Sequence, residues 1–141
     1  MISAVPPQEE AEIHRLIADE MSALCMKDLS RLMSYYTDDV VFFNCRRPLL
    51  CLEGADALRR MWENYLPHIP DSLRAEIREV KLWGIENGGI IACGRLRFTG
   101  AEVDLPERPH TALYRRVGGE WRVASTSTFL PFKPGTEHIA G

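Results

Sequence analysis

A glutamate within a hydrophobic helix stripe is the first residue in this sequence suited to proton chemistry. Glu20 lies three residues after Ile17 and four before Leu24, so helical spacing places its carboxylate on the apolar face. A carboxylate in such a place is either paired or functional, because burial pushes its pKa toward neutrality. The other interpretation is a residue at the margin of the stripe that reaches water or pairs with an arginine.

A histidine near the start of a strand is the second candidate. His110 shares strand alternation with Ala112, so both are expected to face the same side of a sheet. An unperturbed histidine pKa of about 6.5 suits proton transfer. The alternative is a partly solvated histidine at the junction after Pro109. Facing each other across a pocket, Glu20 and His110 would form an acid and base pair.

Other residues could line or polarise a ligand pocket. Asn44 ends an extended run and can orient a carbonyl or hydroxyl group, although asparagine is also a common turn residue. Thr126 and Thr128 would supply donors and acceptors if their face points inward, and would otherwise lie at an interface or in water. The expected apolar lining, which could equally be plain core, is Phe42, Trp62, Tyr65, Trp83, Leu96, Phe98 and Ala112.

Length and composition predict one soluble α+β domain. The chain has 141 residues, of which 45% are hydrophobic and 26% charged, enough for a core over about 8–132, followed by a tail over 133–141. A net charge of −3 disfavours nucleic-acid binding. No apolar run reaches the roughly 20 residues that span a bilayer, and no signal-peptide pattern is present, so we expect a cytoplasmic protein. The four cysteines have no metal-ligand spacing, and we expect them to be reduced and partly buried, with neither metal nor cofactor.

Helical signals occupy the first half of the chain and strand signals the second, the pattern of an α+β fold. Periodicity predicts helices after Pro6-Pro7, over 29–36 and after Gly54, and Pro67 ends the third. Thr37-Asp38-Asp39 is expected to form a turn before a strand over 40–44.

Two hairpins are predicted in the second half. Asn87-Gly88 would join strands over 73–85 and 90–98, and Gly118-Gly119 strands over 110–117 and 120–129. Apolar residues change parity between Ile77 and Val80, which predicts a β-bulge near Glu79. A bent sheet with helices on its concave face encloses a cone. The connections 45–53 and 100–109 are expected to border its mouth.

This combination of segments resembles the SnoaL-like branch of the NTF2-like superfamily, which includes ketosteroid isomerases, polyketide cyclases and scytalone dehydratase. The resemblance covers about residues 10–131. It rests on Lys27-Asp28-Leu29, Tyr36-Thr37-Asp38-Asp39-Val40, Glu53-Gly54-Ala55-Asp56-Ala57-Leu58, Leu113-Tyr114-Arg115-Arg116 and Trp121-Arg122-Val123. It implies a cystatin-like cone, in which three N-terminal helices pack on a curved antiparallel sheet around an apolar pocket, usually in a dimer formed by the outer sheet face. Folds of this kind host many functions.

The resemblance also shows where this chain departs from the steroid isomerases. It places Asn44 where those enzymes have a general-base aspartate, Ala112 where they have an oxyanion-stabilising acid, and Glu20 where they have a stabilising tyrosine. An amide cannot take a proton at neutral pH. Trp62 replaces a supporting pocket tyrosine with a large flat wall.

The sequence therefore predicts an NTF2-like pocket protein that binds a small, largely apolar organic molecule, such as a polyketide, steroid-like, terpenoid or aromatic compound. One alternative is a metal-free lyase or isomerase in which Glu20 and His110 move protons and Asn44 positions the substrate. Another is a non-catalytic oligomerisation module that uses only the outer sheet face. We expect a homodimer through that face.

Overall fold

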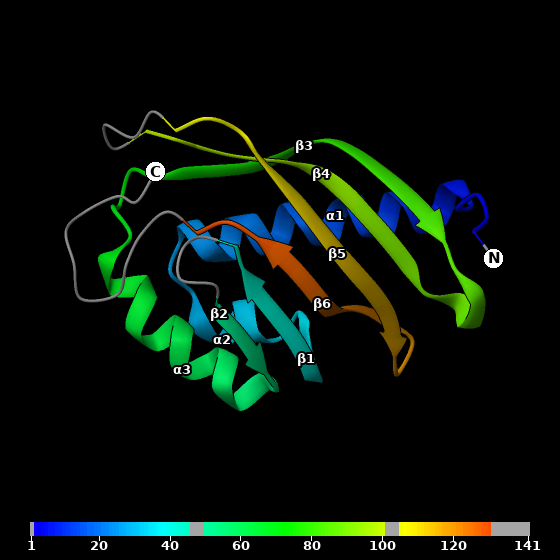
Figure 1. Cartoon of the computed structure of the whole chain (residues 1–141), viewed down its shortest axis with the longest axis horizontal. Coiled ribbons are helices and arrows are strands. Elements are labelled where there is room, and N and C mark those ends of the chain that lie inside the picture. Colours follow the sequence, from blue (N-terminus) through cyan, green and yellow to red (C-terminus); the bar gives the residue numbers. More distant parts are fainter. Residues whose placement is uncertain (1, 46–49, 101–104, 131–141) are drawn as a thin grey trace.

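The computed structural model describes residues 2–45, 50–100 and 105–130. Within them, three helices pack against a six-stranded sheet (Figure 1). The helices are α1 (Pro7–Cys25), α2 (Leu29–Met33) and α3 (Ala55–Tyr65), and short 3₁₀ turns cover Leu66–His68 and Glu86–Gly88. The strands are β1 (Tyr36–Asn44), β2 (Leu50–Glu53), β3 (Arg74–Gly84), β4 (Ile90–Thr99), β5 (Arg108–Val117) and β6 (Glu120–Thr128).

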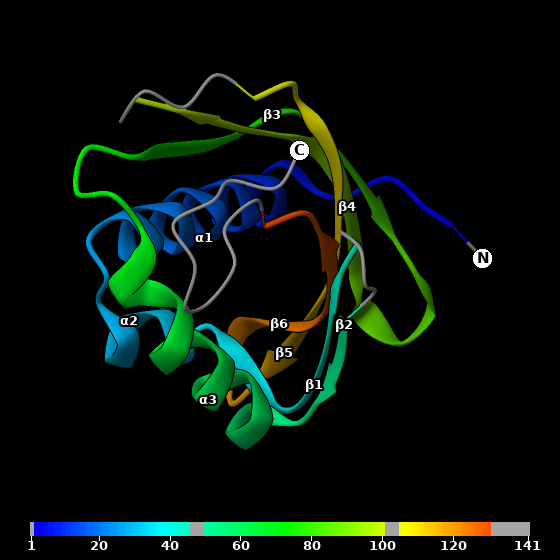
Figure 2. The same ribbon diagram turned by 60° about the vertical axis from the view of Figure 1, so that its left-hand side comes forward.

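The sheet has the order β2-β1-β6-β5-β4-β3. Neighbouring strands run antiparallel except for β1 and β6, which are parallel. Figure 2 shows the sheet curving around α1, with α2 and α3 on its open side. The predicted α+β class, with three helices on a curved and mainly antiparallel sheet, is confirmed.

The apolar stripe of α1 explains its position inside the curve. Pro7 starts the helix, where its missing N–H costs nothing, and Ile13, Leu16, Ile17 and Leu24 are buried against the sheet. Glu20 lies in the same buried row. The helix therefore brings a carboxylate into the core by the spacing that buries its apolar neighbours.

Both predicted hairpins and the predicted bulge are confirmed. β3 pairs with β4, and β5 with β6. The register of β3 against β4 shifts between Arg78 and Lys81, and Glu79 has a positive φ of 53°. A non-glycine residue in this conformation is uncommon and marks a sharply bent backbone.

Two predictions around β1 are wrong. The second helix ends at Met33, and Thr37-Asp38-Asp39 lies within β1 and forms no turn. The reason is that Tyr36 already pairs with Val123 of β6, and an irregularity between Tyr36 and Val41 takes up the extra residues. The expected connection over 45–53 also contains β2, a strand of four residues that is too short to show a period. Residues 46–49 and 101–104, in the connections expected at the mouth, and the predicted tail over 133–141 lie outside the described residues.

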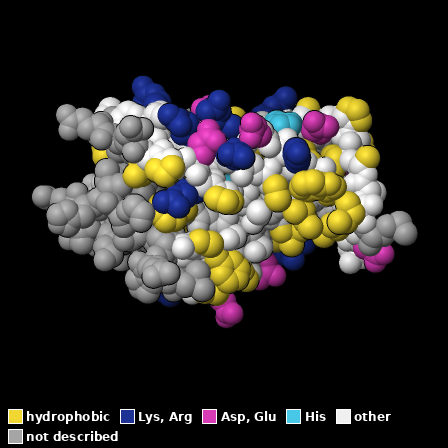
Figure 3. All heavy atoms as spheres, turned by 45° about the horizontal axis from the view of Figure 1, so that its top comes forward, with side chains coloured by type: hydrophobic (Ala, Val, Ile, Leu, Met, Phe, Trp, Pro, Cys, Tyr) yellow, Lys and Arg dark blue, Asp and Glu magenta, His cyan; other side chains and the backbone are white. Residues whose placement is uncertain are grey.

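The pocket assignment of Trp83 is also wrong. After the bulge, alternation turns Val80 and Leu82 inward, so Trp83 lies on the outer sheet face with 36% of its surface exposed. Hydrophobic side chains gather beside charged ones on the face seen in Figure 3.

The four cysteines are free, as expected, but Cys45 and Cys51 are exposed.

Candidate functional site

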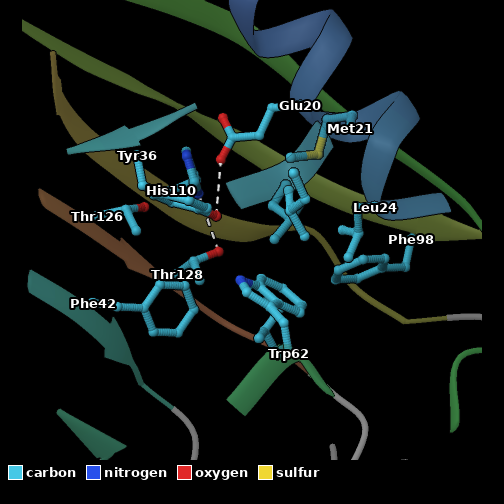
Figure 4. A pocket seen from close by; sticks show the side chains of 13 residues that line it. Glu20, Met21, Leu24, Tyr36, Phe42, Trp62, Phe98, His110, Thr126 and Thr128 are labelled. Carbon is cyan, nitrogen blue, oxygen red and sulfur yellow. Dashed lines mark hydrogen bonds between the residues drawn. The ribbon is translucent and has the colours of Figure 1, made fainter. Parts of the chain in front are cut away.

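A narrow cavity lies between the helices and the inner sheet face (Figure 4). Its walls are Glu20, Met21, Leu24, Leu32, Tyr36, Phe42, Trp62, Leu96, Phe98, His110, Thr126, Thr128 and Leu130. About 380 Å³ between these side chains, including the opening, holds no protein atoms, and about 30 Å³ of it is wide enough for the centre of a water molecule. The edge of Trp62 meets Phe42 with ring centroids 6.0 Å apart, so flat aromatic surfaces form part of the wall.

Glu20 is the ionisable group most changed by this environment. It is 5% exposed, and the hydroxyl group of Tyr36 donates a hydrogen bond of 3.3 Å to its Oε2 atom. Burial raises the pKa of Glu20 to about 7, and the Tyr36 hydrogen bond opposes part of that rise. At neutral pH the carboxyl group therefore exists in both forms, and it can accept or release a proton.

Two tyrosines keep their protons beside this carboxyl group. Burial raises the pKa of Tyr36 well above its usual value, the charge of Glu20 raises it further, and the neighbouring indole of Trp62 lowers it in part. Burial, and to a smaller extent the charge of Glu20, also raise the pKa of Tyr114 well above its usual value. Both hydroxyl groups are therefore hydrogen-bond donors across the physiological range. Tyr36 uses its proton on Glu20, whereas the Tyr114 hydroxyl has no partner among the described residues.

His110 reaches the cavity from β5. It is 6% exposed, and its Nδ1 atom lies 3.1 Å from Oγ1 of Thr128 on the neighbouring β6. Burial lowers the pKa of His110 to about 4, so the imidazole is neutral at physiological pH. Thr128 orients the ring, and in the described part of the chain the Nε2 atom has no hydrogen-bond partner.

A second nitrogen on the same wall is only loosely paired. The indole Nε1 of Trp62 is buried and makes no hydrogen bond of good geometry with the described residues, although it lies close enough to the Tyr36 hydroxyl to lower the pKa of Tyr36. Leaving a buried polar group unpaired costs about 1–3 kcal/mol. The cavity thus combines apolar walls with one unpaired nitrogen, one loosely paired nitrogen and a carboxyl group that titrates near neutrality.

The structure places Glu20 and His110 on one cavity, each with its own partner. Six more of the residues expected at the site line it, namely Phe42, Trp62, Leu96, Phe98, Thr126 and Thr128. The hydroxyl group of Thr126 donates a 3.1 Å hydrogen bond to the backbone oxygen of Thr111 on the neighbouring strand, so this hydroxyl already has a partner within the sheet.

The remaining expected residues lie elsewhere. Asn44 is buried, but its Oδ1 accepts a 3.1 Å hydrogen bond from the backbone N–H of Leu130, so it anchors the chain after β6. Tyr65 packs edge-on against Trp62, with 5.7 Å between centroids, behind the cavity wall. Ala112 is buried in β5 and does not reach the cavity. Trp83 lies on the outer face.

Tyr36 is the polar residue that the sequence analysis missed. Helical spacing after Leu29 assigned it to the second helix, whereas it starts β1 and turns its hydroxyl toward Glu20. Thr37, Val40 and Val41, which follow it, favour a strand and were the signal that could have placed it correctly, but Asp38 and Asp39 between them are typical of a turn.

The sequence profile described as the SnoaL-like domain matches residues 17–129. The chain belongs to the SnoaL-like family. The resemblance drawn from the sequence is therefore confirmed. Among curated proteins, none matches this SnoaL-like chain in sequence.

Solved structures show the same fold. An NTF2-like protein of unknown function from Pseudomonas putida KT2440 is 23% identical, with 96% of each chain covered and a TM-score of 0.77. A putative scytalone dehydratase from Novosphingobium aromaticivorans is 14% identical over 85% of this chain and 82% of its own, with a TM-score of 0.71. A hexachlorocyclohexane dehydrochlorinase, LinA type 2, is 18% identical over 85% and 83%, also with a TM-score of 0.71.

Two further site types were sought in the described residues. No three side chains of His, Cys, Asp or Glu come together there in a way that could hold a metal ion. None of the helices described is both long and apolar enough to cross a membrane.

The raised pKa of Glu20 predicts a stability that changes with pH. The folded protein holds the proton of the Glu20 carboxyl group more tightly than the unfolded chain does. Its contribution to stability is therefore fully present below pH 4.5 and is lost as pH rises through about 7. Glu20→Gln has no carboxyl group there and cannot show this loss. We therefore expect its free energy of unfolding, measured relative to wild type, to increase by about 2–3 kcal/mol between pH 5 and pH 8. Urea denaturation at both pH values measures it.

Glu63→Gln, at an exposed position of α3, is the matched control and should show no such gain. The lowered pKa of His110 acts in the opposite direction, since its contribution is present above pH 6.5 and is lost as pH falls through about 4. The contribution of His110 is the same in wild type and in Glu20→Gln, so it cancels when the two proteins are compared. An equal change for wild type and Glu20→Gln would contradict the assignment of a raised pKa to Glu20.

Proposed function

We propose that this SnoaL-like protein binds a small, largely apolar organic molecule in the cone cavity, with a polar group of the molecule against His110 and Trp62. The observation that carries the proposal is the unpaired buried Nε2 atom of His110 at an apolar cavity, whose wall also holds the indole Nε1 of Trp62, only loosely paired with Tyr36. Buried polar atoms in proteins are usually hydrogen-bonded, so a site that leaves one unpaired and another loosely paired is suited to a ligand that pairs them.

The shape of the cavity favours a flat ligand. The space is narrow, and the rings of Phe42 and Trp62 lie on its wall. A single aromatic ring with a hydroxyl or carbonyl oxygen offers a π surface to these walls and an oxygen to the nitrogens. A fused-ring compound would require side chains such as Met21 and Phe98 to move.

The test is to identify small molecules that co-purify with the protein by native mass spectrometry, and to titrate the emptied protein with phenol as a defined probe. We expect His110→Ala and Trp62→Phe each to weaken phenol binding about tenfold, because each removes one charge-neutral hydrogen bond of about 1–1.5 kcal/mol. Chemical-shift titration gives the dissociation constants.

His68→Ala, which removes an exposed histidine that does not line the cavity, is the matched control and should bind phenol like wild type. If no small molecule co-purifies and phenol shifts no resonance of cavity residues, the ligand proposal is wrong. The protein would then be better explained as an oligomerisation module.

A second candidate function is general acid–base catalysis on such a ligand. The observation that favours it is the pKa of Glu20 near 7, which suits proton transfer at neutral pH. Two similar structures carry the names of a dehydratase and a dehydrochlorinase, both enzymes of elimination reactions. In this proposal Glu20 takes a proton from carbon, Tyr36 holds the carboxylate in place, and His110 bonds the oxygen that gains charge.

Deuterium exchange tests this second function. The α-carbon protons of cyclohexanone in D₂O should exchange faster with wild type than with Glu20→Gln, and the difference should grow as pH rises through about 7 because the base is the ionised carboxylate. NMR follows the loss of the proton signal. Equal exchange for both proteins at every pH would exclude Glu20 as the base.

We also propose a homodimer through the outer sheet face. Trp83, Ile91, Leu113 and Val41 form a row across neighbouring strands, interrupted by Ser125, and Trp83 is exposed. Such a row on a sheet face is a suitable centre for an interface between two copies. We expect Trp83→Glu to shift the protein from dimer to monomer in sedimentation equilibrium. An unchanged mass for Trp83→Glu, or a monomeric wild type, would contradict this.

A further inference from the structure

A second hollow lies along a neighbouring face of α1. It is an open groove between α1 and β3, of which about 430 Å³ is wide enough for the centre of a water molecule. Its walls are His14, Ile17, Ala18, Met21, Ser22, Cys25, Met26, Arg74, Ala75, Glu76, Ile77 and Val80. By the same measure, the cone cavity holds only about 30 Å³. Most of the room beside α1 therefore lies outside the cone.

Met21 is the residue that lines both spaces. It follows Glu20 on α1, and Figure 4 shows its side chain beside the cavity, between Glu20 and Leu24. Methionine is unbranched, with three rotatable bonds, so it can change rotamer at low cost. A flexible, half-buried side chain therefore borders both the cavity and the groove.

The bulge of β3 shapes the groove. Ile77 and Val80, on either side of the bent residues, both line it. Across the sheet, Gly94 makes the bend possible, because a Cβ atom there would lie 2.6 Å from Cγ2 of Ile77 and 3.0 Å from the backbone oxygen of Arg78. A positive φ at Glu79 and a glycine at position 94 are thus both needed for this surface. Bulges are common where a strand borders a functional site.

We infer that the groove is the outer half of the ligand site, and that the ligand is elongated, with a polar ring in the cone and an alkyl or similar chain that passes Met21 into the groove. The inference rests on the proposed function. Ile17, Met21 and Ile77 give the groove an apolar lining that suits such a chain, while the exposed Arg74 and Glu76 also line it and leave part of its wall polar and hydrated.

The test uses phenol, 4-propylphenol and 4-hexylphenol as probes of increasing length. Each buried methylene group is expected to tighten binding roughly fourfold, and in an open groove about three to four of the six carbons of the chain would be buried. 4-hexylphenol should therefore bind wild type on the order of 100-fold more tightly than phenol. Ala18→Trp, at an exposed position of α1 that lines the groove, should reduce the advantage of 4-hexylphenol over phenol to less than about tenfold. Isothermal titration calorimetry measures the affinities.

Ala11→Trp makes the same substitution on the same helix outside the groove and should behave like wild type. Phenol binding with no gain from chain length overturns the groove inference and leaves the proposed function standing. A gain that Ala18→Trp does not remove places the chain elsewhere and also overturns it. Failure of all three probes to bind overturns both the inference and the proposed function.

Cys25 gives a readout that needs no change to the groove itself. Its free thiol lines the groove, and in a variant with Cys45, Cys51 and Cys93 replaced by serine it is the remaining thiol of the chain. Saturating 4-hexylphenol should slow labelling of Cys25 by iodoacetamide at least several-fold, whereas saturating phenol should not. Equal labelling rates with both probes would overturn the inference.

Discussion

The burial of one carboxyl group in an apolar cone is the constraint on which the site depends. Glu20 lies in the same row of α1 as the side chains that attach the helix to the sheet, so the helix cannot pack without taking the carboxyl group out of water. The cost of removing it from water appears as a pKa near 7, only partly offset by the hydrogen bond from Tyr36. Every other polar group at the cavity is neutral in this setting, including the imidazole of His110.

Local patterns predicted much of the fold and part of the site. Glu20 could be placed in the core because helical spacing depends on few residues, and the bulge near Glu79 was visible as a change of parity. His110 could be placed on the inner face because it alternates with Ala112. In these cases one repeating element determines the direction of the side chain.

The errors arose where pairing between distant segments decides the outcome. Tyr36 follows the helical spacing of Leu29 and Leu32, but its pairing with Val123, 87 positions later, makes it a strand residue. Asn44 was expected to meet a ligand, and it instead binds the backbone of Leu130. Trp83 is apolar, and its direction depends on how many residues the bulge inserts. Neither composition nor period contains this information.

The parallel pairing of β1 with β6 has a consequence for the order of folding. β1 is formed by residues 36–44, but its neighbour on the inner side of the sheet is the last strand, which ends at Thr128. The partner of Asn44 in the register, Thr128, also carries the hydroxyl that orients His110. During synthesis, α1, α2 and β1 must therefore wait for nearly the whole chain before the cone can close, and contacts this distant in sequence slow folding. The cavity and the imidazole at its wall are completed together, at the end of folding, by the same strand.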